Sequence, residues 1–150
     1  MQFRDLKKQY EVLKKDIDQN IQSVCLTSHY ISGPEVSKLE EKLAEYVGVK
    51  HCITCANGTD ALTLSLKAWG IGKGDAVFVP DFTFFSSGEC PASLGATCFF
   101  VDVDKNTYNM DSKKLEEAIK KVIAEGKYIP KVVVTVDLFG LPADYDALLK

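Results

Sequence analysis

Arginine is almost absent from this 150-residue sequence, because Arg4 is its only example. Bidentate contacts to the phosphates of a duplex depend on arginine, and the net charge of -3 leaves no basic face for nucleic acid. No apolar run approaches the ~20 residues that a membrane span requires. Met1 leads into a charged amphipathic segment without the apolar stretch of a signal peptide. We therefore expect a cytoplasmic protein that binds neither nucleic acid nor a membrane.

Several catalytic motifs are also missing. The sequence holds no GxxxxGK[ST], GxGxxG, HExxH or GxSxG pattern. The glycines Gly70, Gly72 and Gly74 follow a helical pattern rather than a strand, so we interpret them as a linker. These absences argue against a dinucleotide-binding domain, a P-loop enzyme, a zinc protease of this type and a nucleophile-elbow hydrolase.

Cysteine is present in an odd number, five. Cys52 and Cys55 form a CxxC, but no second pair accompanies it, and His51 is the only nearby histidine. A zinc site would need four ligands at suitable spacing. We therefore predict no metal site, and we expect buried or half-buried free thiols in a reducing compartment.

The first 50 residues have a helical pattern. Residues 5–25 place apolar side chains three and four residues apart, which predicts an amphipathic helix that covers its own domain or faces a partner. Ser32 and Glu35 fit a capping box with Pro34 in the first turn, and a second helix is expected over 35–47, ending at Gly48. His29 and Tyr30 fall in the loop between the helices, where solvent exposure or a position at a ligand's edge are both open.

From residue 51 onward, β-like and helical patterns alternate. Strands are predicted at 51–55, 76–80, 96–103 and 131–138, and helices at 61–69, within 81–94, at 113–125 and from Asp144. This order is typical of a parallel sheet with helices on both faces. Ligands of such sheets bind beyond the carboxyl ends of the strands. We therefore expect a site formed by the segments 57–60, 81–87, 102–104 and 137–140.

The stretch Ala56–Leu62, with the sequence ANGTDAL, lies where the first predicted strand turns into a helix. The first turn of a helix leaves backbone N–H groups unpaired, and with the helix dipole these groups attract anions. Gly58 permits close approach of a ligand, Thr59 adds a hydroxyl, and Asp60 is able to cap the helix. The pattern fits an anion site or an ordinary tight turn.

Aromatic and acidic residues follow the next two predicted strands. Phe84 is a candidate for stacking on a planar heterocycle, whereas Phe82 and Phe85 are predicted to fill the core. Asp102 and Asp104 resemble a carboxylate pair for acid–base chemistry or Mg²⁺, but turn and cap chemistry is the favoured interpretation.

Five segments, taken in this order, resemble the N-terminal part of the DegT/StrS family. They are FRDLKKQY, YISGPEVSKLEEKLAEYVGVKHCITCANGTDALTLSL, GKGDAVFVPDFTFFSS, LGATCFFVDVDKNTYNMD and VDLFGLPADYD. The resemblance covers essentially the whole sequence. It implies a fold type I, three-layer α/β/α large domain in an aminotransferase that uses pyridoxal 5'-phosphate. Its substrates would be a nucleotide-linked keto-sugar, of the kind used in surface polysaccharide pathways, and an amino-acid donor, with glutamate expected.

The resemblance also implies roles for individual residues. Gly58, Thr59 and the Asp60 amide would hold the cofactor phosphate, and Phe84 would stack on the pyridine ring. Tyr30 and Ser32 would lie near the substrate or the partner subunit of a homodimer. We expect residues 1–50 to form a helical segment and 51–150 an incomplete cofactor-binding domain, with its remainder and a small C-terminal domain absent.

The family's reactive residues do not match any position here. The Schiff-base lysine and the aspartate facing the pyridine nitrogen are expected beyond Lys150, so these residues alone are predicted to be inactive. The lysines present are expected on the surface: Lys67, Lys113, Lys114, Lys120, Lys121 and Lys131. Alternatives are a pyridoxal-phosphate-dependent sugar dehydratase of the same family, a non-catalytic phosphate-binding α/β module and an unrelated flavodoxin-like domain.

Overall fold

The computed structural model describes residues 3–149, which form two compact units joined between Thr54 and Cys55. The first unit contains two helices, α1 (Leu6–Thr27) and α2 (Pro34–Val47). Asp5 caps α1 by accepting the Lys8 N–H, and Gly48 ends α2 with a positive φ of 76°. Both helices were predicted. The division after residue 50 stays a prediction.

The start of α2 differs from the predicted capping box. Its N-cap is Gly33 without a side-chain hydrogen bond, Ser32 has a positive φ of 49°, and Pro34 occupies the first turn as predicted. A β-carbon on Gly33 would lie 2.3 Å from the backbone oxygen of His29. The close approach of the His29 carbonyl therefore requires glycine at the position next to Ser32, and the capping role assigned to Ser32 is wrong.

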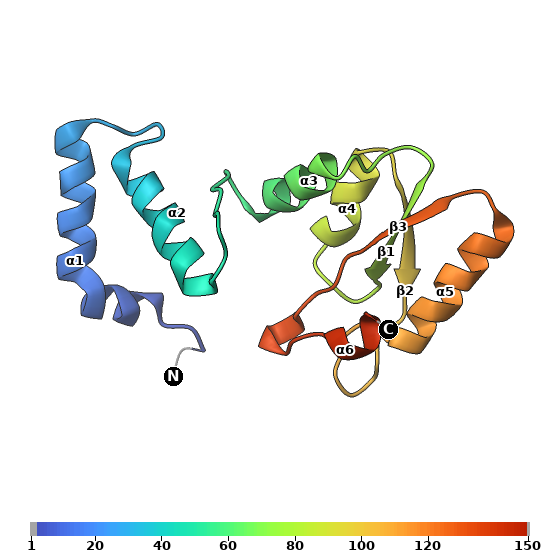
Figure 1. The fold of residues 1–150 in the computed structure, drawn as a ribbon. Coiled ribbons are helices and arrows are strands. Elements are labelled where there is room, and N and C mark those ends of the chain that lie inside the picture. Colours follow the sequence, from blue (N-terminus) through green and yellow to red (C-terminus); the bar gives the residue numbers. More distant parts are fainter. Residues whose placement is uncertain (1–2, 150) are drawn as a thin grey trace. The chain divides into compact units, whose positions relative to one another are not determined.

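The second unit is a three-layer α/β/α structure. Its parallel sheet has the order β2-β1-β3, formed by β1 (Asp75–Pro80), β2 (Thr97–Val101) and β3 (Ile129–Val133). Helices α3 (Gly58–Ala68) and α4 (Ser86–Ser93) cover one face and α5 (Ser112–Glu125) the other (Figure 1). A 3-10 turn, Leu138–Gly140, and the short α6 (Tyr145–Leu148) follow β3. The predicted fold class is confirmed.

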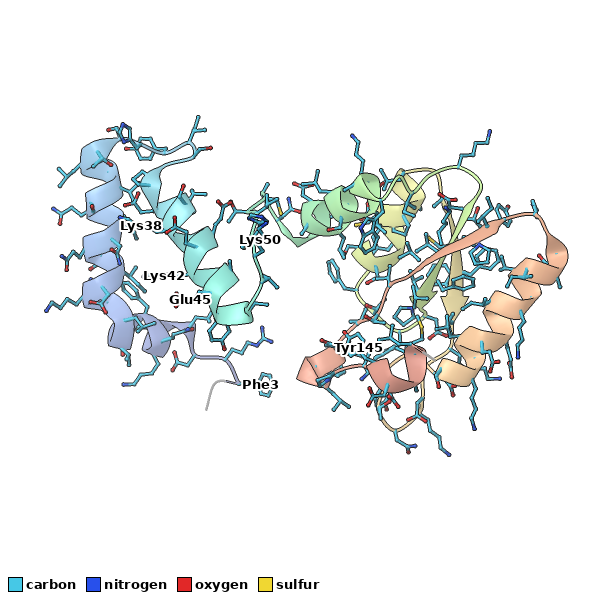
Figure 2. The ribbon with its side chains drawn as sticks, in the orientation of Figure 1. Phe3, Lys38, Lys42, Glu45, Lys50 and Tyr145 are labelled. Carbon is cyan, nitrogen blue, oxygen red and sulfur yellow. The ribbon has the colours of Figure 1, made fainter. Side chains whose placement is uncertain are left out.

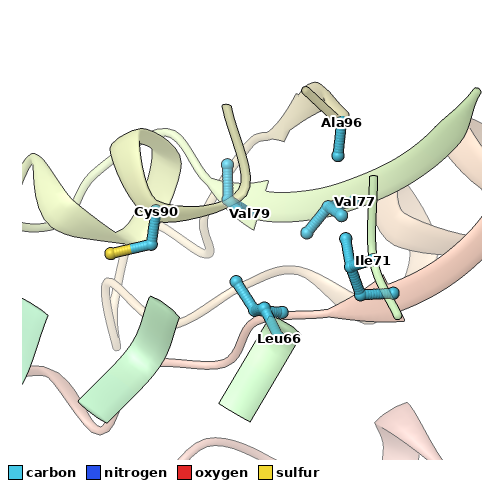
Figure 3. Packing of buried hydrophobic residues seen from close by; sticks show 6 residues of the cluster. All are labelled: Leu66, Ile71, Val77, Val79, Cys90 and Ala96. Carbon is cyan, nitrogen blue, oxygen red and sulfur yellow. The ribbon is translucent and has the colours of Figure 1, made fainter. Parts of the chain in front are cut away.

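Strand β1 organises both cores, because it is central and its side chains alternate between the faces. Val77 and Val79 pack with Leu66 of α3 and Cys90 of α4 (Figure 3). On the other face, Ala76 and Phe78 pack in a cluster that includes Leu115 and Val122 of α5 and Val101 of β2. A continuous apolar strand is what burial on two faces requires.

One predicted strand was wrong, and another was wrong in part. Residues 51–55 form no strand, and Ile53 is 85% exposed. In a strand, the Thr54 N–H would pair with a neighbouring strand. Here the N–H and the hydroxyl of Thr54 both donate to Glu40 Oε1, each at 2.8 Å. These bonds lower the pKa of Glu40, the backbone N–H contributing most. The last predicted strand ends at Val133 rather than residue 138.

Candidate cofactor site

The sequence predicts a helix start within residues 57–60, and α3 begins there, but with Asn57 rather than Asp60 as its N-cap. Asn57 caps the helix: its Oδ1 accepts the Asp60 N–H at 2.9 Å, and its Nδ2 donates to Asp60 Oδ2 at 3.1 Å. The capping role assigned to Asp60 is therefore wrong. Asparagine is among the strongest N-cap residues, and an acidic residue three positions later completes a reciprocal pair. The spacing of Asn57 and Asp60 was therefore the sequence signal that could have identified Asn57 as the N-cap.

The hydrogen bond from the Asp60 N–H to Asn57 decides which backbone N–H groups remain for an anion. Asp60 already donates its amide to Asn57, so it is not free to hold a phosphate in this arrangement. Within residues 3–149, no hydrogen bond engages the amides of Gly58 and Thr59 or the Thr59 hydroxyl. No other group would come within 4 Å of a β-carbon on Gly58, so the approach to these donors is open. Gly58 and Thr59 are therefore the candidate anion cup, with the helix dipole behind their open donors.

Helix α4 fixes this cup from the side. The buried thiol of Cys90 donates to the Thr59 carbonyl at 3.4 Å, and α4 is the main helical neighbour of α3. This contact places the cup beside the loop that follows β1, because that loop leads directly into α4. The position of residues 57–60 thus comes from helix packing and not from the strand that was predicted before them.

The loop after β1 presents its phenylalanines to solvent. Phe84 is 75% exposed, which leaves its ring available for stacking. Phe85 is equally exposed, and Phe82 is about half exposed while its ring centroid lies 5.5 Å from that of Tyr108. The prediction that Phe82 and Phe85 fill the core was therefore wrong, because α4 starts at Ser86 and fills the helix–sheet gap with Ser86, Ser87, Cys90 and Pro91.

A groove of about 390 Å³ lies beside Phe84 and Phe85, between α4 and the edge strand β2. Its wall includes Phe100 and the thiol of Cys98. Burial raises the pKa of Cys98, and the Ala92 N–H acts in the opposite direction. The thiol donates to the Gly88 carbonyl at 3.2 Å, so it is a packing group rather than a nucleophile.

The segments after the three strands meet at one edge of the sheet, as predicted for parallel strands. Asp104 belongs to a turn: its Oδ1 accepts the N–H groups of Asn106 and Thr107, and these bonds hold the pKa of Asp104 below its ordinary value. Asp102 accepts its neighbour's N–H, that of Val103. Turn chemistry is confirmed, and among residues 3–149 no cluster of possible metal ligands occurs.

The loop after β3 is held by contacts that the sequence did not predict. Asn109, in the hairpin after β2, donates from Nδ2 to the carbonyls of Leu141 at 3.1 Å and Pro142 at 3.0 Å. Asp137 accepts the Ala143 N–H and the Tyr145 hydroxyl, each at 3.0 Å. Asparagine and aspartate in turns are too common for their sequence alone to show a contact across 32 residues.

In the first unit, Tyr30 and Ser32 lie in the exposed loop before α2. Their assignment to the substrate stays a prediction. The five cysteines are free, as expected, but Cys25 and Cys55 are exposed rather than buried. Every lysine of residues 3–149 is exposed, including Lys38, Lys42 and Lys50 of Figure 2, so the predicted surface lysines are confirmed. No helix in the described part of the chain is long and apolar enough to cross a membrane.

Comparison with known proteins gives one consistent family. The sequence model of the DegT/DnrJ/EryC1/StrS aminotransferase family matches residues 11–150. The UDP-2-acetamido-2-deoxy-3-oxo-D-glucuronate aminotransferase of Pseudomonas aeruginosa is 45% identical over 99% of this chain and 39% of its own length.

Solved structures agree with this match. A DegT DnrJ EryC1 StrS aminotransferase from Brucella abortus superposes with a TM-score of 0.97 at 49% identity, over 99% of this chain and 40% of that one. DesV of S. venezuelae, in complex with a ketimine intermediate, gives a TM-score of 0.90 at 34% identity, over 99% of this chain and 38% of its own. The chain therefore spans about two fifths of the length of these relatives.

Proposed function

Because this chain belongs to the DegT/DnrJ/EryC1/StrS aminotransferase family, we propose that it forms the phosphate-binding part of a sugar aminotransferase. The proposed reaction moves an amino group from an amino acid, with glutamate as the expected donor, to a nucleotide-linked keto-sugar. The relative from P. aeruginosa carries such a substrate in its name. Pyridoxal 5'-phosphate, the cofactor of this family, supplies the carbonyl and the electron sink when it is bound.

The observation that carries this proposal is the open pair of amides at Gly58 and Thr59. Both donors are unpaired among the described residues, they begin an 11-residue helix, and no side chain blocks Gly58. These features fit a phosphate, which needs several convergent donors. The Thr59 hydroxyl would add a further donor, and Phe84 would orient the ring by stacking.

The remaining chemistry is assigned to residues outside this set. An amine that carries the cofactor and moves a proton needs shielding from water, whereas every lysine among residues 3–149 is exposed. We propose that the 150 residues bind and orient the cofactor but do not turn over substrate. We also propose a homodimer in the cytoplasm. The dimer is supported by the apolar side chains that α1 leaves exposed, among them Leu6, Val12 and Ile21.

Binding of pyridoxamine 5'-phosphate to the chain, measured by calorimetry, tests the cup. This form lacks the aldehyde, so it does not react with the exposed lysines. It should bind more tightly than pyridoxamine without its phosphate. Thr59→Val, which keeps the side-chain shape, should weaken binding about tenfold through the lost hydrogen bond to a charged group.

The matched control is Thr107→Val, which removes a hydroxyl in the hairpin after β2. It should leave the affinity for pyridoxamine 5'-phosphate unchanged. Equal affinity for the ligands with and without phosphate would refute the cup.

A further inference from the structure

Phe139 has a backbone conformation that bulky side chains avoid. Its φ and ψ are 54° and 21°, and Gly140 follows with a φ of 85°. A left-handed phenylalanine is strained, whereas glycine or asparagine accepts this region readily. The side chain gains no burial in return, because it is 87% exposed. Strain of this kind persists only where neighbouring contacts fix the backbone, and it is concentrated at functional sites.

The contacts that fix this loop come from both sides of it. Asn109 is only 5% exposed and holds the carbonyls of Leu141 and Pro142. Its Oδ1 is buried without a hydrogen-bond partner in the described structure, so the hydrogen bonds of this side chain are those that Nδ2 donates to the loop. On the other side, Asp137 holds Ala143 and Tyr145, the latter labelled in Figure 2.

The loop's position links it to the candidate site. Phe139 follows β3, and Phe84 follows β1, which is the neighbouring parallel strand. Both exposed rings therefore belong to the edge of the sheet where the strands end. A substrate that links a sugar to a nucleotide carries its base several bonds away from the reacting carbon. The base needs a recognition group apart from the cofactor cup, and a rigidly held aromatic ring is suited to stacking on it.

We propose that Phe139 is a specificity-determining residue that stacks on the nucleobase of the substrate, and that Asn109 and Asp137 are positioning residues that hold it in place. This inference rests on the proposed function for its substrate class. It differs in its residues, because the cofactor cup uses Gly58 and Thr59.

The test compares UDP with inorganic pyrophosphate as probes of the chain by calorimetry, since only UDP carries a base. Wild type should bind UDP more tightly than pyrophosphate. Phe139→Asn should weaken UDP binding about tenfold, in the range of a lost base–aromatic stack, and leave pyrophosphate binding unchanged. Phe139→Tyr keeps the ring and should retain UDP affinity. Trp69→Asn removes an exposed ring at the opposite edge, before β1, and should have no effect.

Thermal unfolding distinguishes the loss of the Phe139 ring from the relief of its backbone strain. Phe139→Asn relieves the left-handed conformation, so its melting temperature should rise while its UDP affinity falls. Asn109→Ala should also weaken UDP binding, and the double variant should show less than the sum of the two losses, because both act through one loop. Circular dichroism checks that Asn109→Ala is folded; if it is not, the Phe139 comparison alone decides.

Three results would overturn the inference: a wild-type chain that binds UDP no better than pyrophosphate, a Phe139→Asn variant with unchanged UDP affinity, or an equal loss for both probes. Pyridoxamine 5'-phosphate binding is measured in the same variants. It should not change, so failure of the base contact is distinguishable from failure of the cofactor cup.

Discussion

Replacing Asn57 by alanine should lower both the stability of the second unit and its affinity for the cofactor. The Asn57 side chain accepts one N–H at 2.9 Å and donates to the Asp60 carboxylate at 3.1 Å, and alanine removes both bonds. Loss of an N-cap costs about 1 kcal/mol. For a unit of this size the melting temperature should fall by about 4–8 °C.

The same change should weaken pyridoxamine 5'-phosphate binding about fivefold, because the proposed anion cup is the first turn that Asn57 holds in place. Asp111→Ala is the matched control. Asp111 caps α5 by accepting the N–H groups of Lys113 and Lys114, and α5 lies on the opposite face of the sheet.

Urea unfolding and calorimetry on the two variants decide the matter. Asp111→Ala should lose similar stability and keep its cofactor affinity. If both variants lost affinity equally, the effect of Asn57 would be global destabilisation, and the link between the cap and the cup would be wrong.

Two further predictions concern a turn in the second unit and the loop before α2 in the first. Hydrogen bonds from Asn106 and Thr107 lower the pKa of Asp104 in the folded state, so its carboxylate should add stability above its ordinary pKa and lose that contribution as the pH falls through the lowered value. Asp104→Asn should therefore be less stable than wild type at neutral pH, and the difference between their urea midpoints should close in acid. A difference that stayed constant with pH would contradict this. Gly33→Ala should shift the loop before α2, because its β-carbon would lie 2.3 Å from the His29 oxygen. It should destabilise the first unit by about 1–3 kcal/mol, measured by urea unfolding followed by circular dichroism. Gly58→Ala is the control: it has open space around its β-carbon and should have little effect on stability.

Local patterns were sufficient for most of the helices and for the sheet type. The apolar run 76–80 predicted a strand buried on both faces, and β1 is that strand. The Asn-Gly-Thr-Asp junction predicted a helix start with free donors, and α3 begins there. These features depend on side-chain period and on capping within a few residues, which the sequence states directly.

Other predictions failed where a distant partner decides the outcome. The β-branched residues at 53–54 favour a strand, but Thr54 donates to Glu40, 14 residues earlier. Phenylalanine at 82 and 85 favours burial, yet α4 fills the space first. A segment forms a strand only when another strand pairs with it, and a side chain is buried only when another element packs over it. Neither pairing nor burial can therefore be predicted from the local residue types alone.

The sequence by itself determined the family and the parallel α/β architecture, and it pointed to Gly58 and Thr59 as the proposed anion cup, because these rest on local patterns and motif order. Only the tertiary structure decided that Asn57 uses the Asp60 amide and that Cys90 supports Thr59 from α4. It also showed that Asn109 holds the loop carrying Phe139. Hydrogen bonds between residues far apart in the chain form where packing brings donor and acceptor together, and that geometry is fixed only when the layers assemble.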